Sequence, residues 1–326
     1  MSTKDSVLKA LRKSGDHFIS GEDLSKDLGI SRTSVWKAIN SLREEGYNIN
    51  AATNKGYILI ETDEMITEDS LRAFLPARYK NNGIFVYDTV VSTNITAKHI
   101  ALQGFRNGDT VIAMQQTGGR GRLGRSFFSP RTGIYLSIII KPSFDFSRSV
   151  LVTSAAAVSV AEAIEDVCGQ KAKIKWVNDV YIGKKKVCGI LTEAMTGFET
   201  GQIETLIIGI GVNTTVEGFP EDLLDTVGAV EGSYSKAQLA ASIICRTLDY
   251  TSDLESRSFI GPYREKSMVI GKTVKIYKGR YNISPENEIP GIPARVLDID
   301  DNGQLVVLYS NGTRETLSTG EISIRL

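Results

Sequence analysis

A glycine- and arginine-rich segment is the densest chemical signal in this chain. Residues 118–125 read Gly-Gly-Arg-Gly-Arg-Leu-Gly-Arg. Glycine lets backbone N–H groups approach an anion closely, and an arginine side chain can hold phosphate or carboxylate oxygens through two hydrogen bonds. The segment has neither the Gly-Lys-Ser/Thr ending of a Walker loop nor a dinucleotide fingerprint. It therefore predicts an anion-binding loop, with an RGG-like RNA contact and a solvated flexible loop as the alternatives.

A second group of polar residues follows between residues 173 and 193. Asn178 and Asp179 place an amide and a carboxylate at the end of a short apolar strand, where they could hold a metal ion or orient a polar ligand group. Lys186 begins the next strand beside the small residue Gly189 and is a candidate fixed positive charge. The preceding Lys184 and Lys185 are better interpreted as solvated residues of a hairpin tip.

Three further signals are weaker when taken alone. Ser92-Thr93-Asn94 opens a helix after a strand, which suits a polar or anionic ligand group but is also what an ordinary helix cap looks like. Residues 208–213 read Ile-Gly-Ile-Gly-Val-Asn, and glycine at alternate strand positions indicates either close approach of a ligand or a packing or bulge role. Cys188 has no base nearby in the sequence and is interpreted as a small core residue.

The elements that must position these residues form a mixed α/β region with one large core. Helical patterns near residues 93–103, 149–167 and 235–258 separate apolar runs that have the length of strands. These strand-like runs are residues 84–91, 110–113, 134–140, 174–176, 187–193 and 205–209. The acidic and polar residues 61–69 precede this region and are a candidate linker.

The first 60 residues predict a winged helix-turn-helix. A first helix is expected over residues 4–13, Ser20 caps a second helix that Gly29 ends, and Ser31 caps a third. Val35, Ile39 and Leu42 form the apolar stripe of the third helix, and residues 47–51 and 57–60 form a hairpin around a turn at 53–56. The third helix of such a motif enters the major groove of DNA, whereas a helical bundle for protein contacts is the alternative. The candidate DNA-binding residues are Arg32, Thr33, Ser34, Lys37 and, at the hairpin tip, Lys55.

The last 55 or so residues show only strand signals. The expected strands are residues 273–277, 294–299, 304–309, 314–317 and 322–325. Asp301-Asn302-Gly303 and Ser310-Asn311-Gly312 predict hairpin turns, because Asn-Gly tolerates the positive φ angles that tight hairpins need. We expect a small β-barrel.

Composition excludes several classes of protein. The chain has 326 residues and equal numbers of basic and acidic side chains, 38 of each, which argues against a grip on nucleic acid by the whole chain. Its three cysteines are widely spaced, as in a reducing cytoplasm, and its two histidines make a histidine-built metal site improbable. We find no signal peptide and no membrane-spanning run. Residues 1–60 carry nine Lys/Arg against seven Asp/Glu, so any DNA-binding charge is local and weak.

Taken together, these motifs resemble those of bacterial biotin protein ligases of the bifunctional type, which also repress the biotin operon. The resemblance covers nearly the whole chain and rests on four stretches in combination. They are Ser92-Thr93-Asn94, Gln116 with residues 119–125, residues 175–179 and residues 186–191. It implies an α+β multidomain protein: a winged helix-turn-helix over residues 1–64, a mixed-sheet ligase core of class II aminoacyl-tRNA-synthetase type over 65–268, and the small barrel over 269–326.

The resemblance also implies roles for individual residues. Lys186 and Arg122 are the expected catalytic residues, and Asn178 and Asp179 are expected at the ATP and magnesium end, without a dedicated metal site made of protein alone. The residues expected to contact biotin or its adenylate are Ser92, Thr93, Asn94, Gln116, Arg120, Gly121, Arg122 and Lys186, to which we add Gly189 and Asn213.

The implied chemistry is activation of biotin by ATP, with Mg²⁺, to biotinyl-5′-AMP, followed by transfer of biotin to a lysine of the biotin carboxyl carrier protein. Biotinyl-5′-AMP would also act as corepressor for a homodimer that binds operator DNA in the cytoplasm. A lipoate or octanoate ligase and a non-catalytic ligand-sensing repressor are the alternatives.

Three residues depart from the family pattern. Val177 stands where proline is usual, Phe127 stands where tryptophan is frequent, and Gly118 stands where alanine is commoner. None of these changes removes a reacting group. We expect them to affect the fine geometry of the site and the mobility of the loop.

Overall fold

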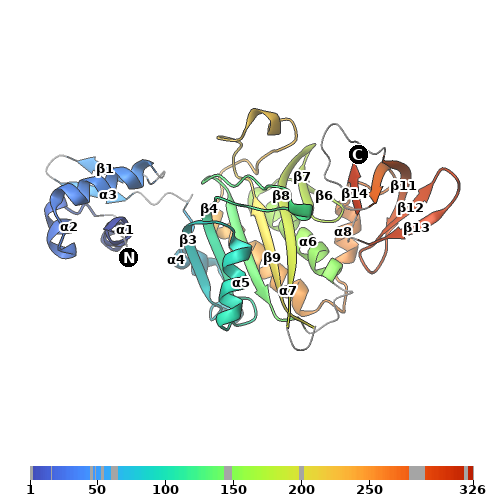
Figure 1. The fold of residues 1–326 in the computed structure, drawn as a ribbon, viewed down its shortest axis with the longest axis horizontal. Helices are drawn as coiled ribbons and strands as arrows, with labels where there is room; N and C mark the ends of the chain where they lie inside the picture. The colour runs from blue at the N-terminus through green and yellow to red at the C-terminus, as the bar shows by residue number, and fades with distance from the viewer. Residues whose placement is uncertain are drawn as a thin grey trace. The chain divides into compact units, whose positions relative to one another are not determined.

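The structure is a computed structural model that divides into two compact units, Met1–Met65 and Ile66–Leu326. It describes residues 3–15, 17–44, 47, 49–52, 55–59, 65–142, 149–197, 202–278, 291–318 and 322–325. Figure 1 shows both units, coloured along the chain from the N-terminus to the C-terminus. In the described residues, no helix combines the length and apolarity needed to cross a membrane.

The first unit contains the expected three helices and a two-stranded hairpin. Its elements are α1 (Thr3–Ser14), α2 (Gly21–Leu28), α3 (Arg32–Glu44), β1 (Ile49–Ala52) and β2 (Gly56–Leu59). Ser20 caps α2 by accepting a hydrogen bond from the backbone N–H of Asp23, and Gly29 ends the helix in the left-handed conformation that suits glycine. Val35, Ile39 and Leu42 are buried against α1, α2 and the hairpin, as their helical spacing predicts. Gly46, where the sequence predicts that the third helix ends, and Thr53 and Asn54 of the expected turn lie outside the described residues.

The second unit is built on a seven-stranded mixed sheet with the order β3-β4-β5-β9-β8-β7-β6. Only β3 and β4 are parallel, and the other neighbours pair in antiparallel fashion. The strands are β3 (Ile84–Val90), β4 (Thr110–Gln116), β5 (Ile134–Ile140), β6 (Ala172–Lys175), β7 (Asp179–Ile182), β8 (Lys185–Thr196) and β9 (Ile203–Val212). The strand β7, which begins at Asp179, was not expected from the sequence.

Helices cover both faces of this sheet. The helices are α4 (Glu68–Phe74), α5 (Thr93–Gln103), α6 (Ser149–Cys168), α7 (Lys236–Ser252) and α8 (Ile260–Lys266), with short 3₁₀ segments at Ala77–Tyr79, Arg122–Gly124 and Glu221–Leu223. Glu68 and Asp69, expected in a linker, instead form the first turn of α4. The single helix expected over 235–258 was too long, because α7 stops at Ser252 and α8 begins at Ile260.

Side chains alternate between the two faces of the sheet along each strand, so each face packs in a different core. Residues such as Ile112, Ile138 and Ile208 pack in the large core with α6 and α7, whereas Val111, Ile139 and Ile207 pack with Ala97 of α5. The α5 side of the sheet therefore presents odd-numbered residues of β5, β8 and β9. Toward the carboxyl end of β9 these residues are Gly209 and Gly211, which have no side chains of their own.

The chain ends in a five-stranded antiparallel sheet with the order β13-β12-β11-β10-β14. Its strands are β10 (Thr273–Lys278), β11 (Ile292–Ile299), β12 (Leu305–Tyr309), β13 (Arg314–Leu317) and β14 (Ile322–Arg325). The described strands form an open sheet and not the closed barrel that we expected (Figure 1). Closure depends on strand tilt and stagger, which a count of strands does not contain.

The two Asn-Gly turns of this sheet also differ from the expectation. Only the glycines, Gly303 and Gly312, have positive φ, at 73° and 84°, and the preceding asparagines do not. The Asp300 carboxylate accepts hydrogen bonds from the backbone N–H groups of Asn302 and Gln304, which builds a longer turn than a two-residue hairpin.

Candidate functional site

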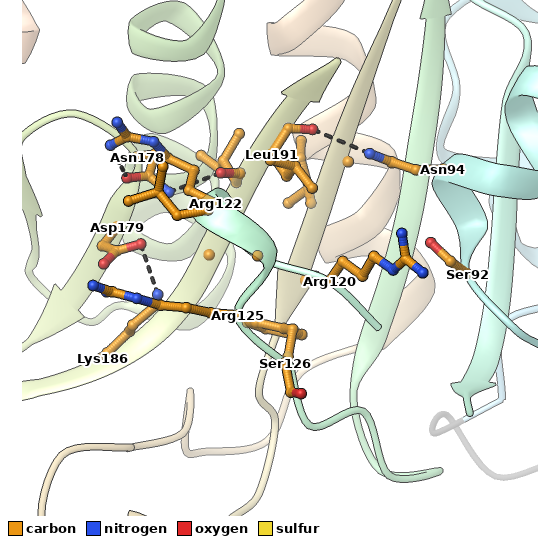
Figure 2. Close-up of a pocket in the computed structure, with 18 of the residues that line it drawn as sticks. Ser92, Asn94, Arg120, Arg122, Arg125, Ser126, Asn178, Asp179, Lys186 and Leu191 are labelled. Carbon is orange, nitrogen blue, oxygen red and sulfur yellow. Dashed lines mark hydrogen bonds and ion pairs between the residues drawn. The ribbon is translucent and has the colours of Figure 1, made fainter. Parts of the chain in front are cut away.

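A pocket opens on the α5 side of the large sheet, with a cavity volume of about 190 Å³. Two groups of residues lie at its opposite ends (Figure 2). The amide end comprises Ser92, Thr93, Asn94 and Gln116, and the charged end comprises Arg122, Asn178, Asp179 and Lys186. The pocket also contains the expected Arg120, Gly121 and Gly189, together with Leu123, Arg125, Ser126, Phe127, Lys175, Trp176, Ile190, Leu191, Gly209, Ile210 and Gly211.

The glycine- and arginine-rich loop folds back on itself beside the pocket. The N–H of Phe127 donates to the carbonyl of Gly119 (2.9 Å), and the N–H of Gly121 donates to the carbonyl of Arg125 (2.7 Å). A Cβ atom at Gly119 would lie 2.4 Å from the carbonyl oxygen of Phe127, so glycine is needed there for the close approach of two backbone segments. Leu123 has φ of 59°, in the left-handed region.

The alternate glycines of β9 make room for side chains. A Cβ atom at Gly209 would lie 2.2 Å from Oδ1 of Asn94, and one at Gly211 would lie 2.4 Å from the ring of Phe127. Gly189 of β8 contacts the same ring, since its Cβ would lie 3.0 Å away. Of the two interpretations left open by the sequence, the packing one therefore holds, and the packed side chains are themselves part of the pocket wall.

Hydrogen bonds between buried residues organise the amide end. Oε1 of Gln116 accepts from the backbone N–H of Thr93 (2.8 Å) and from its hydroxyl (3.1 Å), and Nε2 of Gln116 donates to Oγ of Ser129 (2.9 Å). Ser92, Thr93 and Asn94 are each no more than 5% exposed. The polar groups of Thr93 and Asn94 are therefore held in place before any ligand arrives.

The charged end combines cations with a carboxylate. Nζ of Lys186 lies 2.7 Å from Oδ1 of Asp179 in an ion pair, and NH1 of Arg122 donates to Oδ1 of Asn178 (3.4 Å). Burial lowers the pKa of Arg122 below its ordinary value, and the nearby carboxylate of Asp179 acts in the opposite direction. Arg122 nevertheless remains a cation at neutral pH.

The charged end contains one carboxylate, and its Oδ1 is paired with Lys186. Within the described residues, Oδ1 of Asp179 is buried and makes no interaction with hydrogen-bond geometry, despite its ion pair with Lys186. Among the same residues, no group of three or more His, Cys, Asp or Glu side chains is placed to hold a metal ion. The lone carboxylate can therefore share a cation with ligand oxygens, but it cannot hold the cation unaided.

Two residues singled out from the sequence lie apart from the pocket surface. Asn213 is buried outside the pocket lining, where its backbone N–H donates to Val187 and its side-chain amide donates to the carbonyl of Gly228 (3.1 Å). Cys188 is fully buried, and burial raises the pKa of its thiol above the ordinary range. Cys188 is therefore a core residue and not a nucleophile.

The structure adds residues that the motifs did not identify. Ser137 of β5 contacts Thr93 and Asn94, and Glu193 of β8 accepts a hydrogen bond from Asn94. A hydroxyl within the apolar strand Ile-Tyr-Leu-Ser-Ile-Ile-Ile was a signal that could have been noticed. The indole N–H of Trp176 donates to the carbonyl of Gly303 (2.9 Å), which ties the pocket wall to the C-terminal sheet. The Trp176–Val177 peptide bond is cis.

The first unit presents a polar face on α3. Arg32, Thr33 and Lys37 are exposed, Ser34 is partly exposed, and Lys55 is exposed on the hairpin. Trp36 lies among them with 55% of its surface exposed, and the sequence analysis did not assign it a role. Residues with these donors at the start of a recognition helix suit contacts with bases and phosphates.

Three family profiles match successive stretches of the chain. An HTH domain matches residues 3–58, the Biotin/lipoate A/B protein ligase family matches residues 86–213, and a biotin protein ligase C-terminal domain matches residues 292–325. Their order along the chain is the order of the winged unit, the large sheet and the C-terminal sheet.

Individual relatives agree with these profiles. The chain is 37% identical over 222 residues to the bifunctional ligase/repressor BirA of Bacillus subtilis, a match that covers 67% of this chain and 68% of that protein. It is 29% identical to the Escherichia coli protein of the same name, covering 98% and 96% of the two chains. Among solved structures, the biotin protein ligase from Aquifex aeolicus in complex with biotin and ATP matches with a TM-score of 0.61 and 25% identity, covering 74% of this chain and 98% of that chain. The chain therefore belongs to the family of bifunctional biotin protein ligases and repressors.

Proposed function

We propose that this protein activates biotin with ATP and transfers it to a lysine of the biotin carboxyl carrier protein of acetyl-CoA carboxylase. A biotin carboxylate oxygen attacks the α-phosphorus of ATP, which forms biotinyl-5′-AMP and releases pyrophosphate. The acceptor lysine amine then attacks the acyl carbon, which forms an amide and releases AMP. The observation that carries the proposal is the single pocket that joins a hydrogen-bonded amide end to a charged end.

Lys186 and Arg122 are the proposed catalytic residues. The first step brings a carboxylate and a phosphate together, so a fixed ammonium between them lowers the barrier by neutralising their negative charges. Lys186 already lies in contact with one carboxylate, that of Asp179 (2.7 Å). Arg122 is half-buried and lines the pocket, where it can hold the adenylate and help to exclude water from the mixed anhydride.

The remaining pocket residues divide between the two substrates. We assign the amide end, with Arg120, Gly121 and Gly189, to biotin or its adenylate, and Asn178 and Asp179 to the nucleotide. The carboxylate of Asp179, whose Oδ1 is paired with Lys186, would share an Mg²⁺ ion that is held mainly by the ATP phosphates. That ion supplies charge neutralisation for the triphosphate.

We propose further that the first unit represses transcription by binding operator DNA through α3 and the hairpin. Biotinyl-5′-AMP acts as corepressor by favouring a homodimer that binds two half-sites, because a ligand shifts an equilibrium by its differential affinity for the two states. We infer that the protein acts in the cytoplasm. We also infer that its core has the topology of class II aminoacyl-tRNA synthetases. An operator titration that biotin plus ATP leaves unchanged would contradict the regulatory part.

The direct test of the enzyme is incubation with ATP, Mg²⁺, biotin and a carrier domain, followed by an avidin blot. Biotinylated carrier is expected only when every component is present, and EDTA is expected to suppress it. Parallel reactions with lipoate and octanoate test the related acyl-ligase alternative, which predicts transfer of those acids in preference to biotin. Biotin binding without pyrophosphate release would instead support a ligand-sensing repressor that has no catalytic activity.

A further inference from the structure

The side chain of Asn94 packs into a space formed by three neighbouring strands. Ser137 of β5, Gly209 of β9 and Leu191 of β8 are register partners across the sheet. Gly209 supplies the space, since a Cβ atom there would lie 2.2 Å from Oδ1 of Asn94. The residues on either side of this glycine supply hydrogen-bonding groups, a hydroxyl from Ser137 and a carbonyl from Leu191.

The amide of Asn94 is satisfied by the protein. Nδ2 donates to the carbonyl of Leu191 (3.3 Å) and to Oε2 of Glu193 (2.7 Å), which uses both of its protons. Oδ1 accepts from the hydroxyl of Ser137 (2.6 Å). Glu193 is in turn held by an ion pair with Lys98 (2.7 Å). Asn94 is only 5% exposed, so its amide anchors the start of α5 and leaves no proton for a ligand.

Ser137 connects this anchor to the pocket. Its hydroxyl lies 2.6 Å from Oδ1 of Asn94 and 2.8 Å from Oγ1 of Thr93, whose hydroxyl and N–H both contact Gln116. A hydroxyl carries a single proton, so the orientation of the Ser137 hydroxyl determines which lone pairs of Thr93 remain available. Ser137 has no exposed surface and does not itself line the pocket.

We propose that Ser137 is a positioning residue for biotin recognition, acting through Thr93 and Asn94. This inference rests on the proposed function, in which the amide end binds biotin. The Thr93 hydroxyl donates its own proton to Gln116, so the single proton of Ser137 goes to Oδ1 of Asn94 or to Oγ1 of Thr93 and fixes which of these two oxygens keeps its full capacity to accept. Without Ser137, the amide end can still form, but neither oxygen has this donor, and the arrangement that faces the polar head of the ligand is no longer fixed.

The test is calorimetric titration of the full-length chain with biotin in the absence of ATP. Ser137→Ala is expected to weaken binding about tenfold, while pyrophosphate release at saturating biotin and ATP stays within threefold of wild type. The matched control is Ser159→Ala, which removes another fully buried hydroxyl, one that bonds only the carbonyl of Ala155 within its own helix. Its affinity for biotin is expected to stay within twofold of wild type.

A double-mutant cycle with Thr93→Val separates positioning from a general structural role. Because Ser137 acts in part through Thr93, the Ser137→Ala/Thr93→Val protein is expected to lose less biotin affinity than the product of the two separate losses. Independent effects that multiply in the double variant would overturn the proposal, and so would Ser137→Ala binding within twofold of wild type.

Two further outcomes remain informative. If Ser137→Ala does not fold, Ser137→Cys keeps nearly the same shape with a weaker donor, and a loss of about threefold to fivefold is expected. Wild-type affinity in that variant would overturn the proposal. A wild-type protein that binds no biotin would overturn the proposed function as a whole, whereas normal wild-type binding with an unaffected Ser137→Ala protein would overturn only the positioning role.

Discussion

At the amide end of the pocket, Thr93 and Asn94 are almost fully buried and their polar atoms meet hydroxyl, amide and carbonyl partners. At the charged end, the side chains of Lys186 and Asp179 are 29% and 23% exposed and meet each other as ions. Directional hydrogen bonds in a dry site select a ligand by its pattern of donors and acceptors. Preorganised charges instead stabilise the charge that develops in a transition state. We therefore propose that the amide end determines recognition and the charged end determines rate.

Removing the ammonium of Lys186 should have the largest effect. Lys186→Ala is expected to reduce adenylate formation by about 10²–10³-fold, because a preorganised charge is lost at the point where two anions react. Biotin affinity without ATP should change less than threefold if the two ends act separately. Pyrophosphate release and calorimetry measure the two quantities.

The neighbouring Lys184 provides the matched control. It is exposed at the hairpin before β8, so Lys184→Ala should retain wild-type rates. Pyrophosphate release by Lys186→Ala at a near-wild-type rate would contradict both the catalytic assignment and the division of the pocket into two ends.

Filling the space that Asn94 occupies over Gly209 should have the next largest effect. It should reduce biotin affinity more than turnover, the opposite of the effect of Lys186→Ala. Gly209→Ala introduces a methyl group 2.2 Å from Oδ1 of Asn94, which must then leave the sheet. We expect biotin affinity to fall at least tenfold, with a smaller effect on turnover at saturating substrate. Calorimetry and steady-state kinetics on the same preparation test the split.

Gly261→Ala controls for the general cost of adding a methyl group. No atom lies within 4 Å of the added Cβ, and alanine favours a helix, so this variant should be neutral or slightly stabilised. A Gly209→Ala protein with wild-type affinity would show that the amide end tolerates displacement of Asn94.

The hydrogen bond from Trp176 to Gly303 allows a test of whether the charged end depends on the C-terminal sheet. Trp176→Phe removes the indole N–H and leaves the buried carbonyl of Gly303 without its donor. We expect a loss of about 1–2 kcal/mol in the free energy of unfolding and an increase of a few-fold in KM for ATP, with little change for biotin. Denaturant unfolding and kinetics measure these quantities.

The other tryptophan of the chain is the control for this substitution. Trp36 is 55% exposed on α3, so Trp36→Phe should change the stability of the second unit by less than about 0.5 kcal/mol. Equal losses in the two variants would argue against a specific role for the bond between Trp176 and the C-terminal sheet.

Local sequence patterns predicted a large part of this site, because its chemistry is concentrated in short motifs at the ends of strands. Thr93, Arg122 and Lys186 were identified in this way, Gln116 followed from the family resemblance, and the structure brings all four into one pocket. Ser137 and Glu193 were not, since their role depends on the register of β5, β9 and β8. That register pairs Ser137 with Gly209 and Gly209 with Leu191, which belong to three separate strands, and no local pattern contains it.

The same distinction explains the differences in the fold. Strands such as β5 and β13 were predicted with their observed bounds, because apolar runs and turn residues are local signals. The open C-terminal sheet was expected to be a barrel, and closure is a property of how strands stagger against one another. Asn213 was included for its position after the alternate glycines, but its side-chain amide bonds to Gly228 instead of facing the pocket.

Cys188 should give the smallest effect, although it lies only two residues from Lys186. A register shift in the β7–β8 pairing, where Val180 pairs with Cys188 but Tyr181 pairs with Lys186, interrupts the alternation of β8 between these two residues. Cys188 therefore lies in the core with no exposed surface, and burial raises the pKa of its thiol. The folded protein therefore keeps the thiol neutral as the pH rises from 7 to 9, whereas the unfolded chain begins to form thiolate in that range. Alkylation of Cys188 should be slow in the native protein at pH 8 and fast in urea, as measured by mass spectrometry.

Replacing Cys188 provides a second test of the charged end. Cys188→Ala should retain a rate of adenylate formation within twofold of wild type, with a modest loss of stability from the smaller side chain. Rapid native alkylation with loss of activity, or a large rate defect in Cys188→Ala, would place the thiol among the reacting groups. The charged end would then be a nucleophilic site and not the purely electrostatic one that distinguishes it from the amide end.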